Sequence, residues 1–268
     1  MKIIDAHAHV FPDKLALRSS ESIGNFYGLD WYSPASVGAL LESGKKINAC
    51  HYLVCSSALS PTQTEHINDY MASLMAQHKE FTALGTVHPD NENFKEELAR
   101  VKALGLKGVK LHPDFQKFTI DDEKMLPVYR EIARLGLPVL MHMGDDRYDY
   151  SRPVHLASLM RKVPDLVCIA AHFGGWGRWE EAYEVLVPSD RLYFDTSSAL
   201  MRLGKDDAKR MIEKFGLEKF MFGTDFPIWE PTAEVRRVLE LGFTESENEK
   251  IFSGNFIKLF GLGELDKK

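Results

Sequence analysis

The sequence has few cysteines, no long apolar run and no excess of positive charge. Only three cysteines occur among 268 residues, and none stands in a Cys-x-x-Cys spacing. This pattern argues against a disulfide framework and against a thiolate metal site. Because Cys50, Cys55 and Cys168 fall in apolar, strand-like runs, we expect all three to be buried free thiols.

Two classes of partner are excluded by what is missing. No stretch approaches the roughly 20 apolar residues of a membrane span, and the N-terminal KII run is too short for the apolar core of a signal peptide. We therefore expect a cytoplasmic protein with no membrane association. The net charge of -6 and the pI near 5.9 describe a mildly acidic surface. Such a surface repels a phosphate backbone, so nucleic acid is not an expected partner.

What the sequence does contain is a repeat of strand-like and helical segments. Eight apolar runs recur at nearly even spacing, and a segment with helical periodicity follows each. We predict strands at residues 2–9, 47–56, 81–88, 106–112, 137–143, 166–173, 192–197 and 219–225. We predict helices near residues 34–45, 63–78, 92–104, 121–135, 152–163, 178–187, 206–215 and 231–241, with an extra C-terminal helix at about 245–260.

This order predicts an α/β fold, an eight-stranded (β/α)8 TIM barrel formed as one domain by residues 1–268. Barrels of this kind often self-associate, so a homo-oligomer is compatible with the sequence. One connector, residues 10–33, does not follow the repeat and holds five aromatic residues. We predict an aromatic-rich loop after the first strand, either a lid or a segment packed on the barrel rim.

The pentapeptide DAHAH at residues 5–9 ends the first predicted strand. In extended chain, residues i and i+2 point the same way, so His7 and His9 can converge on one point. That arrangement is typical of a metal site. The alternative is a pair of surface histidines near the N-terminus.

Further metal-competent side chains end other predicted strands. His142 ends the fifth strand, His172 the sixth and Asp225 the eighth, and the carboxyl ends of barrel strands face a common mouth. Imidazoles and a carboxylate suit Zn²⁺ or a related divalent ion. Taken singly, His142 and His172 could be hydrogen-bonding rim residues, and Asp225 could cap the following helix.

These residues resemble the amidohydrolase superfamily, and within it the amidohydrolase-2 branch that includes aminocarboxymuconate semialdehyde decarboxylase. The resemblance rests on DAHAH, LMHMGD around His142, AHFGGW around His172 and GTDFP around Asp225. It implies that one divalent metal, Zn²⁺ in our expectation, is held by His7, His9, His142 and Asp225. By the same resemblance His172 would activate or orient the metal-bound water.

The predicted function is metal-dependent hydrolysis of a small metabolite through an amide, ester or lactone bond, using a metal-activated water. His172 or Asp225 would take and return the proton. The alternative is a metal-dependent nonoxidative decarboxylase of an unsaturated or aromatic carboxylic acid. A phosphoesterase or DNase would require more acidic ligands. A non-catalytic metal-binding protein is disfavoured because a histidine occupies the water-activating position.

Two residues of the fourth strand are candidates for substrate binding. Lys110 could bind a substrate carboxylate, pair with a neighbouring acid, or bridge two metals as a carbamate, as the binuclear branches of the superfamily imply. We favour one metal. His112 either reaches the substrate or only marks a turn, as His88 does in its own His-Pro-Asp tripeptide.

Other residues have two interpretations each. Asp195 orients a ligand histidine or begins a loop. Three tryptophans after strands six and eight either line a substrate site or pack on the barrel rim. Three arginines after strands five and six either bind an anionic group or are solvated charges at helix starts. These six residues are Trp176, Trp179, Trp229, Arg147, Arg152 and Arg178.

Overall fold

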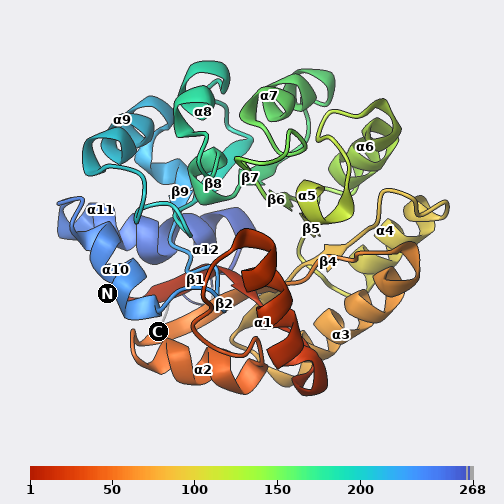
Figure 1. Ribbon diagram of the computed structural model, residues 1–268, viewed down its shortest axis with the longest axis horizontal. Coiled ribbons are helices and arrows are strands. Elements are labelled where there is room, and N and C mark those ends of the chain that lie inside the picture. The colour runs from red at the N-terminus through yellow and green to blue at the C-terminus, as the bar shows by residue number, and fades with distance from the viewer. Residues whose placement is uncertain (264, 266–268) are drawn as a thin grey trace. The chain divides into compact units, whose positions relative to one another are not determined.

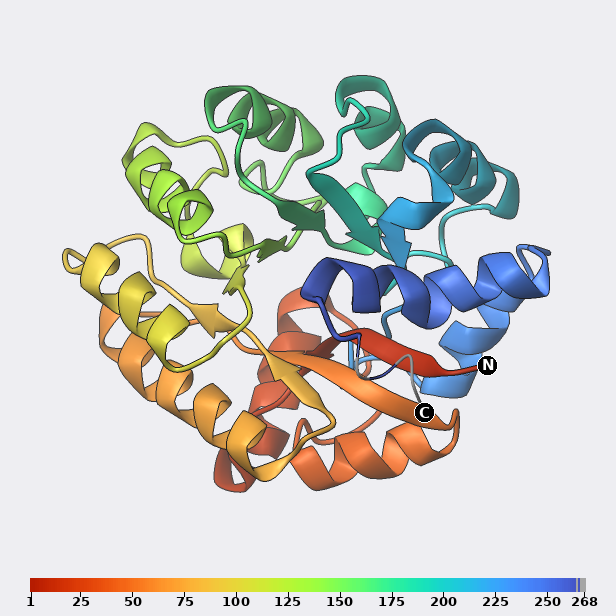
Figure 2. The same cartoon turned by 180° about the vertical axis from the view of Figure 1, so that it is seen from behind.

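The computed structural model describes residues 1–263 and 265, and this part of the chain divides into two compact units. Unit 1 contains Met1–Cys55 and the described residues from Thr196 onward. Unit 2 contains Ser56–Asp195. Figure 1 and Figure 2 show the elements of both from opposite sides. The prediction that residues 1–268 form one domain stays a prediction.

Unit 1 is built on a pair of parallel strands. Its strands are β1 (Ile3–His9), β2 (Ala49–Cys55) and β9 (Phe220–Met221). Its helices are α1 (Asp13–Tyr27), α2 (Val37–Lys45), α9 (Lys205–Phe215), α10 (Pro231–Leu239), α11 (Glu245–Glu249) and α12 (Asn255–Phe260). β1 and β2 lie side by side in both views. An apolar cluster that includes Ile3, Phe222 and Phe252 joins β1 to the C-terminal segment and forms part of the core.

Backbone hydrogen bonds place the segment after β9 alongside β1. Ala6 donates to the carbonyl of Phe222, and Asp225 donates to the carbonyl of His7 at 2.9 Å. His9 in turn donates to the carbonyl of Phe226. Because these bonds fix the register, Asp225 is held beside the two histidines of β1 although more than 200 residues separate them in sequence.

Unit 2 contains a parallel sheet with helices arranged outside it (Figure 1). The strands of unit 2 are β3 (Phe81–Ala83), β4 (Gly85–Thr86), β5 (Val109–Leu111), β6 (Val139–Met141), β7 (Cys168–Ala170) and β8 (Leu192–Asp195), and this sheet pairs β4 through β8 in sequence order. Its helices are α3 (Thr64–Gln77), α4 (Phe94–Ala103), α5 (Pro113–Gln116), α6 (Leu126–Arg134), α7 (Pro153–Lys162) and α8 (Trp179–Val185).

The register of this sheet aligns the strand ends of unit 2. Leu111 is opposite Met141, and Met141 is opposite Ala170. His112 and His142 therefore leave adjacent strands at the same level, and His172 follows one residue later. All residues of β5, β6 and β7 are buried, as expected for parallel strands covered on both faces.

The eight predicted strands and nine predicted helices all correspond to elements of the structure, most of them with shorter bounds. The third predicted strand, residues 81–88, is divided into β3 and β4. The helix predicted at 121–135 begins with a 3₁₀ turn, Glu123–Met125, before α6. The predicted C-terminal helix is interrupted by a π-helical segment, Lys250–Gly254, between α11 and α12.

The prediction that residues 10–33 form a loop is wrong, because α1 occupies 15 of them. The buried face of α1 consists of Ala16, Ser20 and Gly24, small residues four apart that produce no apolar periodicity. Small side chains are required there: a Cβ on Gly24 would lie 2.7 Å from the carbonyl oxygen of Leu29. The sequence feature that could have indicated this helix is Gly28, which ends it with φ +65°.

One cysteine prediction is also wrong. Cys55 and Cys168 are buried free thiols, as predicted, whereas Cys50 is exposed on the solvent side of β2. Alternation along a strand sends neighbouring residues to opposite faces, and the first residues of β2 are not yet covered. Every described helix is either too short or too polar to traverse a bilayer.

Candidate metal centre and catalytic histidines

Three donor atoms converge at the end of β1 in unit 1, and we call His7, His9 and Asp225 the donor cluster. The Nε2 atoms of His7 and His9 are 3.2 Å apart. Asp225 Oδ1 lies 3.6 Å from the first and 3.4 Å from the second. The three atoms thus form a nearly equilateral triangle.

This triangle has the dimensions of a zinc ligand set. Nitrogen and oxygen donors about 2.0–2.2 Å from a tetrahedral Zn²⁺ are about 3.3–3.6 Å from one another. The His7 side chain is fully buried, whereas those of His9 and Asp225 are 13% and 16% exposed. The cluster is therefore mostly buried but still accessible at His9 and Asp225, and two imidazoles with one carboxylate fit a divalent ion.

Asp225 is not a helix cap, the alternative considered from the sequence. It adopts the left-handed conformation, with φ 57°, and α10 begins six residues later at Pro231. Its Oδ2 accepts a hydrogen bond of 2.5 Å from Ser198 Oγ. The carboxylate is therefore fixed by side-chain contacts rather than by a helix N-terminus.

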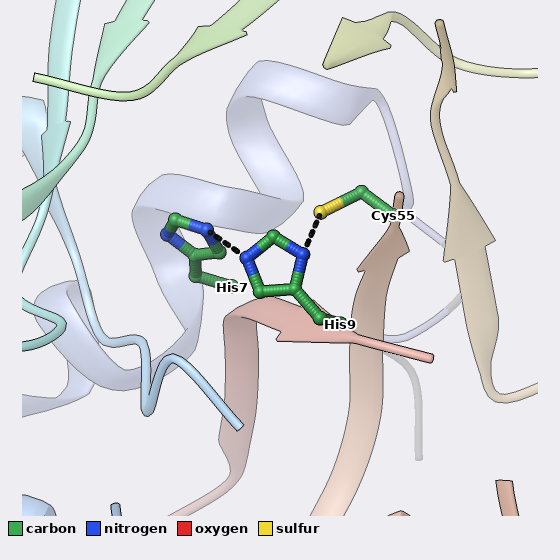
Figure 3. A group of neighbouring side chains, drawn as sticks. All are labelled: His7, His9 and Cys55. Atoms are coloured by element: carbon green, nitrogen blue, oxygen red, sulfur yellow. Dashed lines mark hydrogen bonds between the residues drawn. The ribbon is translucent and has the colours of Figure 1, made fainter. Parts of the chain in front are cut away.

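Outer contacts also orient the two histidines. His7 Nδ1 lies 3.2 Å from Ser197 Oγ, and His9 Nδ1 lies 3.7 Å from Cys55 Sγ. In Figure 3 the ring of His9 lies between His7 and Cys55, with one nitrogen toward each. When Nδ1 carries the proton and donates it, Nε2 keeps its lone pair for a metal.

Cys55 offers an alternative grouping, since its sulfur and ring nitrogens of His7 and His9 lie within 4.8 Å of one another. The sulfur contacts His9 Nδ1, the nitrogen opposite the one that faces Asp225. A single imidazole presents one nitrogen to one ion. Sulfur and carboxylate therefore cannot share an ion with His9, and the shorter distances favour the carboxylate.

Asp5, which sequence reasoning quoted but left without a role, holds β1 to the segment that carries Asp225. Its Oδ1 accepts from the backbone nitrogens of His7 and Thr224, and its Oδ2 accepts from Thr224 Oγ1 at 2.6 Å. Asp5, His7 and His9 are spaced two apart in DAHAH, and this spacing could have indicated that Asp5 lies on the same face of the strand as the two histidines.

A second group of polar residues follows the strand ends of unit 2. His142 and His172, which we call the histidine pair, have Nδ1 of the first 3.1 Å from Nε2 of the second. His142 Nε2 is 3.1 Å from the carbonyl oxygen of Gly144. A carbonyl only accepts, so His142 Nε2 carries a proton, and in the neutral ring Nδ1 accepts. His172 Nε2 therefore donates to it.

The backbone of His172 is held in place by two side chains. Its N–H donates to Asp195 Oδ1 at 3.1 Å, and its carbonyl accepts from Trp179 Nε1 at 2.9 Å. His172 and Phe173 both have positive φ. Non-glycine residues in this region are uncommon and cluster at functional sites. Asp195 thus positions the main chain of this histidine.

His112 has a local structural role, as its turn motif indicated. Its Nδ1 accepts from the backbone of Phe115, which caps α5, and its ring is stacked on Phe115 and on His142 at centroid distances of 3.7 and 3.9 Å. Lys110, in β5, is completely buried. The prediction that His112 and Lys110 bind substrate stays a prediction.

Asp114 is a buried carboxyl beside His142, and it was missed in the sequence. Its Oδ2 lies 3.7 Å from His142 Nε2, and its side chain has no exposed surface. Burial raises the pKa of Asp114 to about 7, and the neighbouring carboxylate of Asp145 adds to that rise.

The three arginines considered for anion binding are engaged within unit 2. Arg147 forms two hydrogen bonds to the carboxylate of Asp145, and Arg178 donates to the carbonyl of the same residue. Arg152 pairs with Glu181. These contacts favour a structural role for all three side chains.

The structure thus brings together His7, His9 and Asp225 in unit 1, and His142, His172 and His112 in unit 2. The prediction that members of both groups bind one ion stays a prediction. A model of the amidohydrolase-2 type, described as amidohydrolase, matches residues 4–262. The chain belongs to the amidohydrolase-2 family.

A curated relative gives this amidohydrolase a named counterpart. The chain is similar to 2-amino-3-carboxymuconate-6-semialdehyde decarboxylase from Dictyostelium discoideum, with 25% identity over 239 residues. The match covers 74% of this chain and 66% of the relative's length.

Solved structures show the fold of this amidohydrolase. An uncharacterised TIM-barrel protein from Bordetella bronchiseptica matches with a TM-score of 0.78 and 19% identity over 98% of this chain and 100% of the other. The 5-carboxyvanillate decarboxylase LigW from Sphingomonas paucimobilis matches with a TM-score of 0.74 and 16% identity, over 97% of this chain and 99% of the other. A putative 2-pyrone-4,6-dicarboxylic acid hydrolase from Pseudomonas putida matches with a TM-score of 0.69 and 20% identity, over 97% of each chain. The predicted α/β fold of TIM-barrel amidohydrolases is therefore confirmed.

Proposed function

We propose that this protein is a metal-dependent nonoxidative decarboxylase of a small unsaturated or aromatic carboxylic acid. The donor triangle of His7, His9 and Asp225 carries the proposal, because its edges of 3.2, 3.6 and 3.4 Å suit one divalent ion. The curated relative is named a decarboxylase, as is one of the similar solved structures. These names favour carbon dioxide release over the hydrolysis that we expected first from the sequence.

In this proposal the donor cluster holds the ion, and His142 is the fourth ligand predicted from the sequence. For that role the Nδ1 atom of His142 would exchange its hydrogen bond from His172 for the ion. Zn²⁺ remains our expected metal, and a divalent ion there would polarise an oxygen of the substrate when bound. The Asp225 carboxylate faces both imidazoles and offsets the charge of the ion.

His172 is the proposed proton donor. Its Nε2 carries a proton in the arrangement deduced above, and its main chain is fixed by Asp195 and Trp179. In the imidazolium form of His172, transfer of one ring proton to the carbon that bears the carboxylate saturates this carbon and leaves a neutral imidazole, which water protonates again. The bond to the carboxylate then breaks, its electron pair returns to the unsaturated system, and carbon dioxide leaves. Such proton transfer contributes typically about 10²–10⁴ to a rate.

Lys110 and His112 are proposed to contact the substrate. A lysine ammonium suits a carboxylate that must be oriented before its bond to carbon breaks. Lys110 is fully buried in β5, where a charge opposite the substrate acid would act in a low dielectric.

The second candidate is hydrolysis of a lactone-type bond, which the similarity to the putative 2-pyrone-4,6-dicarboxylic acid hydrolase favours. One assay separates the two. Purified protein is supplied with aromatic and unsaturated acids and with carboxylated lactones, while carbon dioxide and net acid are both measured. Carbon dioxide in step with substrate loss supports the decarboxylase, and acid without carbon dioxide supports the hydrolase.

Metal analysis tests the site itself. We expect about one equivalent of metal in protein purified without chelator, and loss of that metal in His142→Ala and Asp225→Ala. Metal-free wild-type protein that gains nothing on addition of Zn²⁺ or Mn²⁺ would contradict the proposed function.

A further inference from the structure

Ser198 lies at the centre of a short chain of hydrogen bonds that ends on the donor cluster. Trp229 Nε1 lies 2.7 Å from Ser198 Oγ, and the same oxygen lies 2.5 Å from Asp225 Oδ2. All three residues belong to unit 1, and Ser198 is 5% exposed.

The direction of both hydrogen bonds follows from the chemistry of the groups. An indole N–H only donates, so the hydroxyl of Ser198 accepts from Trp229. An ionised carboxylate only accepts, so the single hydroxyl proton of Ser198 is donated to Asp225 Oδ2. The chain therefore runs from Trp229 through Ser198 to Asp225 with no alternative orientation. Its second bond is charge-assisted and correspondingly short.

This bond divides the two oxygens of Asp225 between two tasks. Oδ2 is committed to Ser198, and Oδ1 is the oxygen that faces the Nε2 atoms of His7 and His9. A carboxylate held in this way presents one oxygen to an ion. Without the hydroxyl, the group is free to rotate and to present both.

The backbone at Ser198 is adapted to this contact. Ser198 has φ 56°, in the left-handed region that a serine seldom adopts. Its neighbour Ser197 contacts His7 Nδ1 at 3.2 Å. The two consecutive serines of the FDTSS segment thus contact two different members of the donor cluster.

We propose that Ser198 is a positioning residue that holds Asp225 as a one-oxygen ligand, with Trp229 orienting the Ser198 hydroxyl. The inference rests on the proposed metal site and goes beyond it by assigning roles to two residues that contact no ion. The loss of outer partners of metal ligands typically lowers metal affinity about 10–100-fold.

Metal affinity and cobalt spectra of purified full-length protein test this proposal. For Ser198→Ala we expect about 10–100-fold weaker binding of Zn²⁺ and of Co²⁺, measured by competition with a chelator. The visible absorption of the Co²⁺ form should also change in intensity, because a two-oxygen carboxylate raises the coordination number. Trp229→Phe keeps the hydroxyl and loses only its orientation, so its affinity should fall by a smaller factor.

Two further variants separate positioning from folding. Ser198→Gly removes the hydroxyl but relieves the positive φ, so it should match Ser198→Ala in metal affinity even if its melting temperature is higher. Ser253→Ala is the matched control, since Ser253 is a buried serine of unit 1 whose hydroxyl donates to the carbonyl of Glu249. Its metal affinity and cobalt spectrum should equal those of the wild type.

The outcomes are distinguishable from failure of the proposed function. If wild-type protein binds metal and Ser198→Ala has the same affinity and cobalt spectrum, the positioning role is wrong and the metal site stands. If Ser198→Gly regains wild-type affinity, backbone strain rather than the hydroxyl is the cause, and the proposal is again wrong. If the wild type binds neither Zn²⁺ nor Co²⁺, the proposed function fails first.

Discussion

The two units differ in what their histidines contact. In the donor cluster of unit 1, the Nε2 atoms of His7 and His9 face each other and one carboxylate oxygen, while their other nitrogens contact Ser197 and Cys55. In unit 2, the ring nitrogens of His142 contact a backbone carbonyl and the other histidine of the pair. The first arrangement places three potential ligand atoms within 3.6 Å of one another, and the second fixes which atoms of His142 and His172 carry protons.

This difference teaches that residues of one type, all at strand ends, can serve two kinds of chemistry. Lone pairs held about 3.3 Å apart without protons between them repel one another and are stabilised by a cation. A chain of donor and acceptor nitrogens is stable without one and can transfer a proton. The predictions below separate binding from proton transfer.

The largest effect is expected from Asp225→Asn. The change removes the only negative charge of the donor cluster while keeping its shape, so metal affinity should fall at least about 100-fold and activity with it. Metal content after dialysis measures the first, and carbon dioxide release the second. Asp195→Asn is the control of the same chemistry, and it should keep its metal. Equal metal content in Asp225→Asn and wild type would remove the distinction between the units.

The next largest effect is expected from His172→Gln. Glutamine keeps a donor but cannot give up a proton, so turnover should fall about 10²–10⁴-fold while the metal content stays near that of the wild type. Parallel metal analysis and single-turnover assays measure both. Loss of metal along with activity would assign His172 to the ligand set instead.

Gly144→Ala should destabilise unit 2 without touching the donor cluster. Gly144 has φ +84°, and a Cβ there would lie 2.3 Å from the backbone nitrogen of Trp176. The backbone must shift, and with it the carbonyl that fixes the tautomer of His142. We expect a loss of about 2–4 kcal/mol in unfolding free energy, measured in urea.

Gly38→Ala supplies the control for that measurement. Gly38 lies within α2, and apart from its chain neighbours and the local helix backbone no heavy atom lies within 4 Å of the added Cβ. Alanine there should be neutral or stabilise by up to about 1 kcal/mol. Equal stability of the two alanine variants would refute the steric argument at Gly144.

Glu234→Gln tests a buried carboxyl of unit 1. Burial raises the pKa of Glu234 to about 7, with Arg237 acting against the rise and Asp225 and Asp5 adding to it. The folded state therefore keeps this proton above the pH at which the unfolded chain, with a pKa near 4.5, releases it. Stability from this group is complete below pH 4.5 and falls as pH rises to about 7, by at most about 3 kcal/mol.

Glutamine cannot ionise, so the variant should lose this fall between pH 4.5 and 7. Urea unfolding at four or five pH values measures the slope. An unchanged slope in the variant would show that Glu234 is ionised throughout and held by Arg237.

The smallest effect is expected from Cys55→Ser. A hydroxyl can still accept from His9 Nδ1, although its shorter bond to Cβ leaves a gap, so metal affinity should change by less than about threefold. Chelator competition with Zn²⁺ measures the change. A loss as large as that of Asp225→Asn would show that sulfur binds the ion in place of the carboxylate.

Much of the fold was predictable because local pattern controls it. The strands and most helices were found from apolar runs and helical periodicity, and only α1 was missed among the long helices, since its buried face is made of small residues. Periodicity reports side-chain hydrophobicity. It cannot detect a helix that packs by close backbone approach.

The donor cluster was predictable in part for a related reason. The two-residue spacing of His7 and His9 is a local property of extended chain, and strand-end positions pointed to Asp225. The outer partners were not predictable: Ser198 and Trp229 are common residues in a loop, and no spacing relates them to Asp225. Their roles depend on a left-handed backbone at Ser198 and on the direction of two hydrogen bonds.

By itself, the sequence determined which residues could bind a metal, the order of strands and helices, and the family to which the chain belongs. Only the tertiary structure decided which nitrogen of each histidine faces which partner and which oxygen of Asp225 is left for an ion. The physical reason is range. Periodicity and propensity act over a few residues, whereas the orientation of each ligand is set by contacts between segments 27 to 190 residues apart in the chain.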